Sequence, residues 1–488
     1  MERHNNPIAN SYSLYGEKLS RRSGILELMD DLGEAVTLHP DILMLGGGNP
    51  AAIPEVQQIW RERTAELLAS TADFDQMLAS YDAPQGNPYF LDAFAQLFSD
   101  RFGWPITSKN VGISNGAQPG VFSLLNLLAG PNAGGTRKYV LMPLSPDYVG
   151  YADMGIDDQM FIACPGKITF VPNSGLFDDE SEIRSDAEPD SGCEPLLSGG
   201  GFFKYAVDFD RVERLLAMGT VAALLVSRPT NPSGNVIRHD ELVELDRLAA
   251  QYNAYLIVDN AYGTPFPAVL EEESLLDKVF YSPRTIQTFS LSKIGLPGLR
   301  TAFIVGPEEI IQRLAAMTAI IGLANGNVGQ RLTLPLFQTG RILDISRQLV
   351  RPFYQKRRRL AVRLLTDALK RSGIAWRLHV SEGAFFLWLW LPDLKISAAQ
   401  LYETLKQRGV LIIPGEGFFY GCDETAALDA KSGRTKSDRA ERDIADSSTS
   451  EKLFAKHRSQ CIRISFSAKQ FALGQAFEII AQTAAEFC

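Results

Sequence analysis

The chain has 488 residues, of which 45% are hydrophobic and 22% charged, a composition typical of a globular protein with a large core. The formal net charge of −9, without a basic stripe, argues against nucleic acid as the main partner. The five cysteines include no CxxC pair, the N-terminus lacks a signal-peptide core, and the apolar stretch 383–391 is too short to span a bilayer. We therefore expect a cytoplasmic protein with free thiols.

The first two thirds of the chain alternate between short apolar runs and helical patterns. The clearest helical pattern is 240–252, where Leu242, Leu245 and Leu248 recur at helical spacing. Such alternation predicts βαβ units and a mostly parallel sheet with both faces covered. The predicted strands are "YVLMPL" (139–144), "AALLVS" (222–227), "YLIVD" (255–259), "TFSLS" (288–292) and "TAFIVG" (301–306).

The pattern changes after about residue 335. A long basic helix is expected over 347–369, and Pro352 marks its start or a kink. The remaining segments predict a smaller α+β domain. They are a hairpin of 376–380 and 384–391, a helix at 397–409, strands at 410–415 and 461–467, and a closing helix at 471–487.

These patterns divide the chain. Residues 1–50 are expected to form an N-terminal arm and part of the small domain, 51–340 the large domain, and 341–488 the small domain. Two stretches, 173–201 and 421–457, are rich in charged and small residues. Neither has enough apolar side chains to pack well, so we expect both to be mobile insertions.

Several common motifs are excluded. The stretch "GPNAGGTRK" (130–138) lacks the lysine that a P-loop places directly after its second glycine, and "GGGNP" (46–50) opens no dinucleotide-binding helix. Neither GxSxG nor HExxH occurs, and the five histidines are scattered, which argues against a histidine-based metal site.

Three polar residues follow predicted strands. Asp259 ends "YLIVD", Asn231 lies in "SRPTNPSG" after "AALLVS", and Lys293 follows "TFSLS". Taken singly, Asp259 is typical of a helix cap or a salt bridge, Asn231 of a turn, and Lys293 of a surface lysine. Together they would share the carboxyl edge of one parallel sheet, where open α/β sheets bind ligands.

A phosphate site is predicted near the same edge. The start of the apolar helix in "SNGAQPGVFSLLNLL" offers free backbone N–H groups, and the segment 290–300 offers side-chain donors. The residues are Gly116, Ala117, Gln118, Ser290, Ser292 and Arg300. A lysine, an acid, a phenol (Tyr262) and a phosphate cradle together suggest pyridoxal 5′-phosphate as cofactor.

At this point the chain resembles a known family, the fold-type I pyridoxal-phosphate aminotransferases of classes I and II. The longest matches favour the branch that transfers an amino group between L-valine and pyruvate. The matching motifs run in family order over nearly the whole chain outside the two insertions. They are "LGGGNPAAIPE" (45–55), "SYDAPQG" (80–86), "SNGAQ" (114–118), "SRPTNPSGNVI" (227–237), "VDNAYGTPFP" (258–267), "SLSKIGLPGLR" (290–300), "EGAFFLWLW" (382–390) and "RGVLIIPGEGFF" (408–419).

The resemblance implies a role for each matching residue. Lys293 would hold the cofactor aldehyde covalently and Asp259 would pair with its ring nitrogen, so residues 51–340 would bind the cofactor. The other implied contacts are Tyr262 and Asn231 to the phenolic oxygen, Tyr148 on the ring, the six residues named above at the phosphate, and Tyr81 at the phosphate in a partner subunit. Arg463, with Gly48 and Asn231, would bind the substrate α-carboxylate. By the same analogy, Asn231–Pro232 is expected to be cis.

The implied protein is a cytoplasmic homodimer that shares its active sites and works by a ping-pong mechanism on amino acids and 2-oxo acids, without a metal, nucleic acid or a membrane. Substrate choice would depend on apolar residues near the N-terminal arm, such as Tyr15 and Ile25. Alternatives are an aminotransferase for another neutral or aromatic amino acid, a pyridoxal-phosphate-dependent lyase, an effector-binding domain of a regulator, and a protein in which these polar residues are structural. The short arm before the first motif and the acidic charge argue against the regulator.

Overall fold

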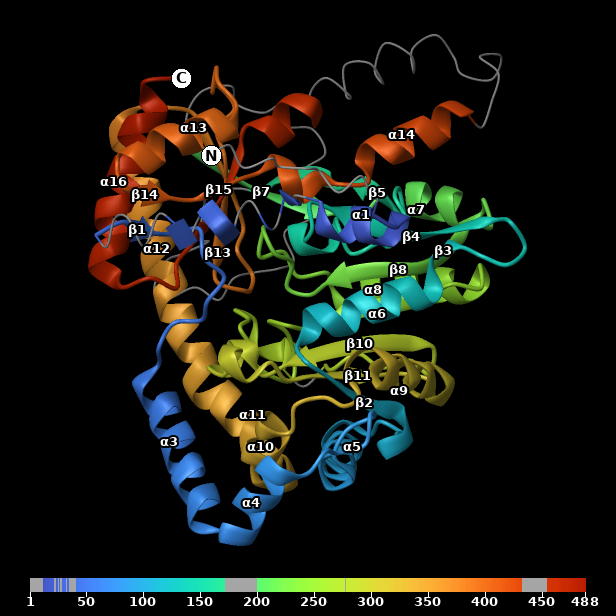
Figure 1. Ribbon diagram of the computed structural model, residues 1–488. Helices are drawn as coiled ribbons and strands as arrows, with labels where there is room; N and C mark the ends of the chain where they lie inside the picture. Colours follow the sequence, from blue (N-terminus) through green and yellow to red (C-terminus); the bar gives the residue numbers. More distant parts are fainter. Residues whose placement is uncertain are drawn as a thin grey trace, which may run out of the picture.

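The computed structural model describes residues 12–34 with gaps, 41–171, 200–276, 278–431 and 454–488. Within these ranges no helix has the length and apolar character needed to cross a membrane. Two large sheets organise the protein, and a long helix, α12 (Arg351–Ser372), extends beside both of them (Figure 1).

The larger sheet carries the predicted strand ends. Its order is β2-β11-β10-β9-β8-β4-β3, with β5 beside β4. The pairs β10–β9, β9–β8, β8–β4 and β4–β5 are parallel, and only β11 and the short β3 run antiparallel to their neighbours. The bounds are β2 Val111–Ser114, β3 Gly130–Pro131, β4 Arg137–Ser145, β5 Phe161–Pro165, β8 Val221–Ser227, β9 Tyr255–Asp259, β10 Thr285–Ser290 and β11 Ala302–Val305.

Helices cover both faces of this sheet, because its central strands are apolar on both sides. On one face, α6 and α9 pack on a cluster that includes Ile257, Ile286 and Ile304. On the other, α7 and α8 cover β8 and β9, while α5 and α10 contribute phenylalanines beside Phe289 and Phe303. The bounds are α5 Pro88–Phe102, α6 Ala117–Leu128, α7 Phe209–Leu216, α8 His239–Gln251, α9 Glu308–Gly322 and α10 Val328–Gln338.

The second sheet has the order β15-β16-β13-β12-β7-β6, and it is antiparallel except for the pair β12–β7. A separate parallel pair joins β1 to β14. Helices α12, α13 and α16 pack beside these strands. The bounds are β1 Leu43–Met44, β6 Lys167–Val171, β7 Gly200–Ala206, β12 Trp376–His379, β13 Phe386–Trp390, β14 Val410–Leu411, β15 Ile413–Pro414, β16 Cys461–Ser465, α13 Ala398–Gln407 and α16 Gln470–Ala485.

The remaining helices connect these units. α3 and α4 lead from β1 toward the large sheet, and α11 precedes α12. α1 lies near β4 and β5, where Lys18 and Arg21 form ion pairs with Asp158 (Figure 1). The bounds are α1 Leu14–Ser20, α3 Pro54–Ala69, α4 Thr71–Ala79, α11 Arg341–Ile345 and α14 Cys422–Lys431.

The predicted fold class is confirmed. The structure contains the mostly parallel, doubly covered sheet and the α+β unit, including the hairpin β12–β13 and the helix α8. Helix α12 begins at Arg351 directly after a π-helical turn, Ser346–Val350, so Pro352 lies where the helix type changes within a continuous helical stretch. The division at residue 340 stays a prediction.

Three expectations differ from the structure. β6 and β7, which flank the first predicted insertion, belong to the second sheet, although they lie within residues 51–340. The beginning of the second insertion is the helix α14, and Cys422 and His457 are buried, so its two ends are packed rather than mobile. Residues 172–199 and 432–453 lie outside the described residues.

The third difference is the Asn231–Pro232 bond, which is trans; the neighbouring Arg228–Pro229 bond is cis instead. Two backbone hydrogen bonds close the loop around Asn231, from Thr230 to Asn235 and from Gly234 to Thr230.

Candidate active site

The polar residues predicted at the strand ends do meet at one edge. β8, β9 and β10 are parallel neighbours that end at Ser227, Asp259 and Ser290. Because parallel strands share their carboxyl edge, the loops carrying Asn231 and Lys293 begin at the same side of the sheet as Asp259. Arg463 reaches this place from the second sheet, where it lies on β16 and hydrogen-bonds Asn231.

Asp259 is a buried carboxylate with three donors. It accepts hydrogen bonds from the Tyr151 hydroxyl at 2.5 Å, the Thr288 hydroxyl at 2.9 Å and the Ala261 N–H at 2.9 Å. Burial raises the pKa of Asp259, while the donors and the nearby Lys293 oppose the shift. No cation of the described residues lies in ion-pair contact with it. The carboxylate is therefore suited to a cationic group from a ligand.

Lys293 presents its amine between aromatic rings. Its Nζ lies 5.5 Å from the centre of the Tyr262 ring and 5.8 Å from that of Phe385, and it donates to the Gly48 carbonyl at 2.7 Å. Burial lowers the pKa of Lys293 to about 8, with further lowering by Arg463 and Arg300, whereas Asp259 acts in the opposite direction. Near neutral pH a usable fraction is the neutral amine, the nucleophilic form.

Arg463 is a buried cation without a counter-ion among the described side chains. Only 4% of it is exposed. Its guanidinium donates to Asn231 Oδ1 at 2.8 Å and to the Gly46 carbonyl at 2.6 Å, and it lies over the rings of Phe386 and Phe418 at 4.4 and 5.4 Å. Burial lowers its pKa to about 10, and its Nε has no partner. Such a fork is suited to a carboxylate.

The predicted phosphate donors form a cradle at the start of α6. Gly116 precedes the helix with φ +104° and no side-chain cap, so the first helical N–H groups, at Ala117 and Gln118, lack a capping side chain. A Cβ on Gly116 would lie 2.1 Å from Arg300 Nη2, so the guanidinium lies directly against this glycine. The hydroxyls of Ser290 and Ser292 are 3.0 Å apart on the adjacent strand end.

Two tyrosines add aromatic surfaces. The Tyr148 hydroxyl lies 3.4 Å from Gln118 Oε1, and its ring packs edge-on against Tyr151, the donor to Asp259. Tyr262 is buried, and burial raises its pKa. Tyr148 thus lies between the anion cradle and the Asp259 carboxylate.

The structure does not bring every predicted residue into this group. Tyr81 is 83% exposed in the loop after α4, and no hydrogen bond or ring contact joins it to the other described site residues. Its role stays a prediction about a partner subunit. Tyr15 is exposed on α1, and Ile25 lies outside the described residues.

Sequence reasoning missed several residues that shape the site. Tyr151 and Thr288 donate to Asp259. Asp147 is buried, accepts from the Ser227 hydroxyl, and burial raises its pKa to about 7. The Gly46 carbonyl orients Arg463. The only signal in the sequence for these residues was their closeness to predicted site residues or strands. Asp147 and Tyr151 lie close to Tyr148 in the chain, and Thr288 lies in a predicted strand.

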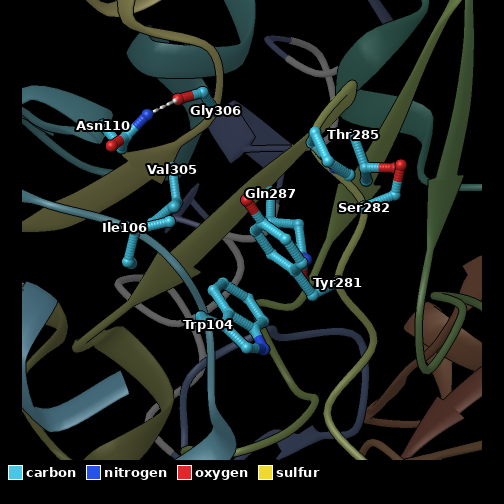
Figure 2. Close-up of a pocket in the computed structure, with 10 residues that line it drawn as sticks. Trp104, Ile106, Asn110, Tyr281, Ser282, Thr285, Gln287, Val305 and Gly306 are labelled. Atoms are coloured by element: carbon cyan, nitrogen blue, oxygen red, sulfur yellow. Dashed lines mark hydrogen bonds between the residues drawn. The ribbon is translucent and has the colours of Figure 1, made fainter. Parts of the chain in front are cut away.

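A second hollow lies elsewhere in the large sheet, and none of the predicted site residues borders it. Figure 2 shows Trp104, Tyr281 and Gln287 around it, with Asn110 bonded to the Gly306 carbonyl. Thr285 begins β10 and Val305 ends the antiparallel β11, so this hollow lies at the edge opposite to Asp259. It is separate from the candidate active site.

The residues of the site fit pyridoxal 5′-phosphate. Three groups that this cofactor needs occur at one edge of the sheet. They are a carboxylate for the ring nitrogen, an amine of lowered pKa for the aldehyde, and a helix N-terminus with an arginine for the phosphate. Within the described ranges, no three His, Cys, Asp or Glu side chains are grouped so as to hold a metal ion.

Comparison with known proteins identifies the class. The family model "Aminotransferase class I and II" matches residues 197–434. Together with a curated relative that this chain matches over most of its length, this shows that the chain belongs to the class I and II aminotransferases, transaminases of fold type I that generally use pyridoxal phosphate.

Within that family the chain is similar to valine–pyruvate aminotransferase of Escherichia coli, with 38% identity over 414 residues, 85% of this chain and 90% of that protein. Among solved structures, a putative amino-acid aminotransferase from Psychrobacter arcticum has a TM-score of 0.82 at 36% identity, covering 98% of this chain and 99% of the other. The valine–pyruvate aminotransferase of Salmonella typhimurium has a TM-score of 0.73 at 33% identity, covering 94% and 98%.

Proposed function

We propose that this protein is a pyridoxal-phosphate-dependent aminotransferase that converts L-valine and pyruvate to 3-methyl-2-oxobutanoate and L-alanine. The observation that carries the proposal is the position of Lys293. Its amine, with a pKa lowered to about 8, lies in one site with the buried carboxylate of Asp259 and with the guanidinium of Arg463, which has no counter-ion among the described side chains. These are the groups that amino transfer between α-amino and 2-oxo acids requires.

The chain would hold the cofactor at three points. Asp259 would face the ring nitrogen and keep it protonated, Lys293 would bind the aldehyde covalently, and the start of α6 with Arg300 would bind the phosphate. Tyr148 would cover the ring, and Tyr262 and Asn231 would donate to its phenolic oxygen. When bound, pyridoxal phosphate supplies an aldehyde that takes up the amino group and a ring that accepts negative charge.

The protein would then position the substrate and move one proton. Arg463 would bind both oxygens of the α-carboxylate, beside Asn231 and Gly48, and so fix the α-carbon. Lys293, once displaced as a free amine, would take the α-proton as a base and later return one as an acid, which a pKa near the working pH favours. Because the amino acid and the oxo acid use the same site in turn, we expect ping-pong kinetics.

The aromatic surroundings support a neutral substrate. Phe386 and Phe418 line Arg463, and Phe385 lies beside Lys293. The two arginines that lower the pKa of Lys293 are Arg463 and Arg300, which the proposal assigns to the α-carboxylate and to the cofactor phosphate. Valine is the favoured donor because the chain is similar to two valine–pyruvate aminotransferases. An apolar pocket discriminates between substrates that differ by one methylene by only about 1–3 kcal/mol.

The assembly and location belong to the same proposal. We infer a cytoplasmic homodimer in which Tyr81 reaches the cofactor phosphate of the partner subunit. Tyr81 is exposed, and so are the apolar residues Ile320, Ile321 and Leu323 at the C-terminal end of α9. The segment that follows α9 lies beside the loop of Tyr81, because Asn327 donates to the Ser80 carbonyl at 3.2 Å. The cysteines within the described ranges, Cys164, Cys422, Cys461 and Cys488, are free thiols. We also propose a large domain at 51–340, except for β6 and β7, which belong to the second sheet, and a small domain at 341–488.

A panel of amino donors tests the function. Purified holoenzyme is mixed with pyruvate and L-valine, L-leucine, L-phenylalanine or L-aspartate, and alanine formation is measured, with Lys293→Ala as control. We expect valine to be among the best donors, aspartate to be poor, and the variant to be inactive. A preference for an aromatic donor would favour the aromatic alternative, and release of an unsaturated product without alanine would favour a lyase.

Borohydride reduction tests the covalent assignment independently. Peptide mass spectrometry should find the reduced cofactor on Lys293. A saturated protein that carries no label on this residue would refute the proposal.

A further inference from the structure

The segment between β1 and α3 connects the two key cations of the site. It contains three consecutive glycines, Gly46 to Gly48, and two of its carbonyls accept hydrogen bonds from site residues. The Gly46 carbonyl accepts from Arg463 at 2.6 Å, and the Gly48 carbonyl accepts from Lys293 at 2.7 Å. The segment therefore orients the carboxylate-binding guanidinium and the catalytic amine together.

This segment needs to be fixed at both ends, because a glycine run loses more conformational freedom on ordering than any other sequence. At its start, the Leu45 N–H donates to Leu411 at 2.9 Å, and the Leu45 carbonyl accepts from Ser465 at 2.7 Å. At its end, the Ala51 N–H donates to the Tyr354 hydroxyl at 2.8 Å. Among the described residues, no hydrogen bonds other than those of Gly46, Gly48 and Ala51 tie residues 46–51 to the rest of the protein.

Tyr354 is itself held rigidly. It lies on α12, the helix that runs beside the connection from β1 to α3 in Figure 1, and only 2% of it is exposed. Its ring stacks on Phe385 at 5.3 Å with an interplanar angle of 20°, and Phe385 faces the Lys293 amine. Burial raises the pKa of Tyr354, so the hydroxyl stays neutral over the working pH range.

We propose that Tyr354 is a positioning residue for the reaction, which acts by fixing the end of the Gly46–Gly48 segment and thereby orients Arg463 and the free Lys293 amine. The inference rests on the proposed function. Tyr354 itself touches neither cation through its hydroxyl; its effect passes through the two glycine carbonyls.

The variant Tyr354→Phe tests this, because it removes the hydroxyl and keeps the buried ring. Loss of one neutral hydrogen bond is expected to lower kcat/KM about five- to tenfold for both L-valine and pyruvate. The matched control is Tyr252→Phe, which removes a hydroxyl at the C-terminal end of α8 that donates to Glu213 of α7 at 3.1 Å, and it should leave kcat/KM unchanged.

A double-mutant cycle separates positioning from general packing. In an Arg463→Ala background, the segment still orients Lys293 but no longer has this guanidinium to orient, so Tyr354→Phe should lower kcat/KM by a smaller factor than in the wild-type background. An equal fall in both backgrounds would show that the effect of Tyr354 does not pass through Arg463 and would overturn the inference. Unchanged kcat/KM in the single variant would overturn it as well.

A second readout does not depend on turnover. In the cofactor-free full-length protein, the pKa of Lys293 is measured by competitive acetylation and peptide mass spectrometry at a series of pH values. The Gly48 carbonyl stabilises the protonated amine, so Tyr354→Phe should lower this pKa, while Tyr252→Phe should not change it. An unchanged value would refute the link. If reduction instead fails to label Lys293 in wild-type holoenzyme, the proposed function fails, and the acetylation result still decides the positioning of the amine.

Discussion

Replacing Arg463 by lysine tests the recognition of the substrate most directly, because it keeps the charge and removes the fork. The guanidinium donates to Asn231 Oδ1 at 2.8 Å and to the Gly46 carbonyl at 2.6 Å, and in the proposed function it also binds the substrate carboxylate. A lysine amine, as a point charge, does not reproduce these directed bonds and a bidentate contact at the same time. Hydrogen bonds to charged groups contribute about 1.5–3 kcal/mol each, so losing one or two costs about 3 kcal/mol.

This cost predicts a fall in kcat/KM of about 100- to 1000-fold. Every substrate with an α-carboxylate shares the contact, so L-valine, L-alanine and 3-methyl-2-oxobutanoate should all be affected to a similar degree. Isobutylamine, which is valine without its carboxylate, should react slowly with both enzymes and lose little in the variant. The assay is single-turnover reaction of the holoenzyme with each compound, followed by the cofactor's absorbance.

The matched control is Arg408→Lys, which alters an exposed pair with Glu486 and should change the rates less than twofold. An equal loss for isobutylamine would show that Arg463 supports the fold of the site and does not bind the carboxylate. A loss confined to one amino acid would also contradict the assignment.

Three further substitutions have definite expected results. Gly116→Ala should weaken cofactor binding about tenfold or more in a fluorescence titration, because φ +104° is strained for alanine and the new Cβ displaces Arg300; Gly298→Ala, with open space around it, should not. Asp259→Asn should keep the fold but slow exchange of the substrate α-proton about 100-fold or more, since an uncharged amide cannot pair with a cation, and retained exchange would contradict this role. Burial raises the Asp147 pKa from 3.8 to about 7, so between about pH 4 and 7 the folded state keeps a proton that the unfolded chain has released. The free energy of unfolding therefore falls as the pH rises through this range. Asp147→Asn should remove this fall, which urea unfolding at several pH values measures.

The positions of Asp259, Asn231 and Lys293 were predictable because a parallel sheet brings the carboxyl ends of its strands to one edge. Asp259 ends a run that is apolar on both faces and Asn231 follows another, and that pattern places both strands in a covered sheet. The strand before Lys293 is mixed in sequence, although all six of its residues are buried. The start of α6 was predictable for a similar reason, since a glycine before an apolar helix leaves its first N–H groups free.

Contacts made by backbone carbonyls and by residues distant in sequence could not be predicted in this way. The Gly46 and Gly48 carbonyls are chemically like all other carbonyls, so only the folded path shows which of them meet Arg463 and Lys293. Burial was equally hidden for Arg358, part of a basic run typical of an exposed helix face, which pairs with Glu271 in the interior. A charged residue in the sequence predicts an exposed side chain, but the prediction fails where a residue of opposite charge from elsewhere in the fold forms an ion pair with it.

In the proposed function, the electrostatics of the site connect binding of the substrate at Arg463 to the basicity of Lys293. Burial is the largest cause of the lowered Lys293 pKa, and the positive charge of Arg463 is the next. A carboxylate bound to Arg463 offsets that positive charge, while the burial of Lys293 remains. The amine therefore becomes a stronger base when a substrate with an α-carboxylate is present than when the site holds none. A compound that lacks this carboxylate leaves Arg463 uncompensated and the amine weaker. In the proposed function, the same guanidinium would contribute to selectivity twice, once by binding the carboxylate and once by setting the basicity of Lys293.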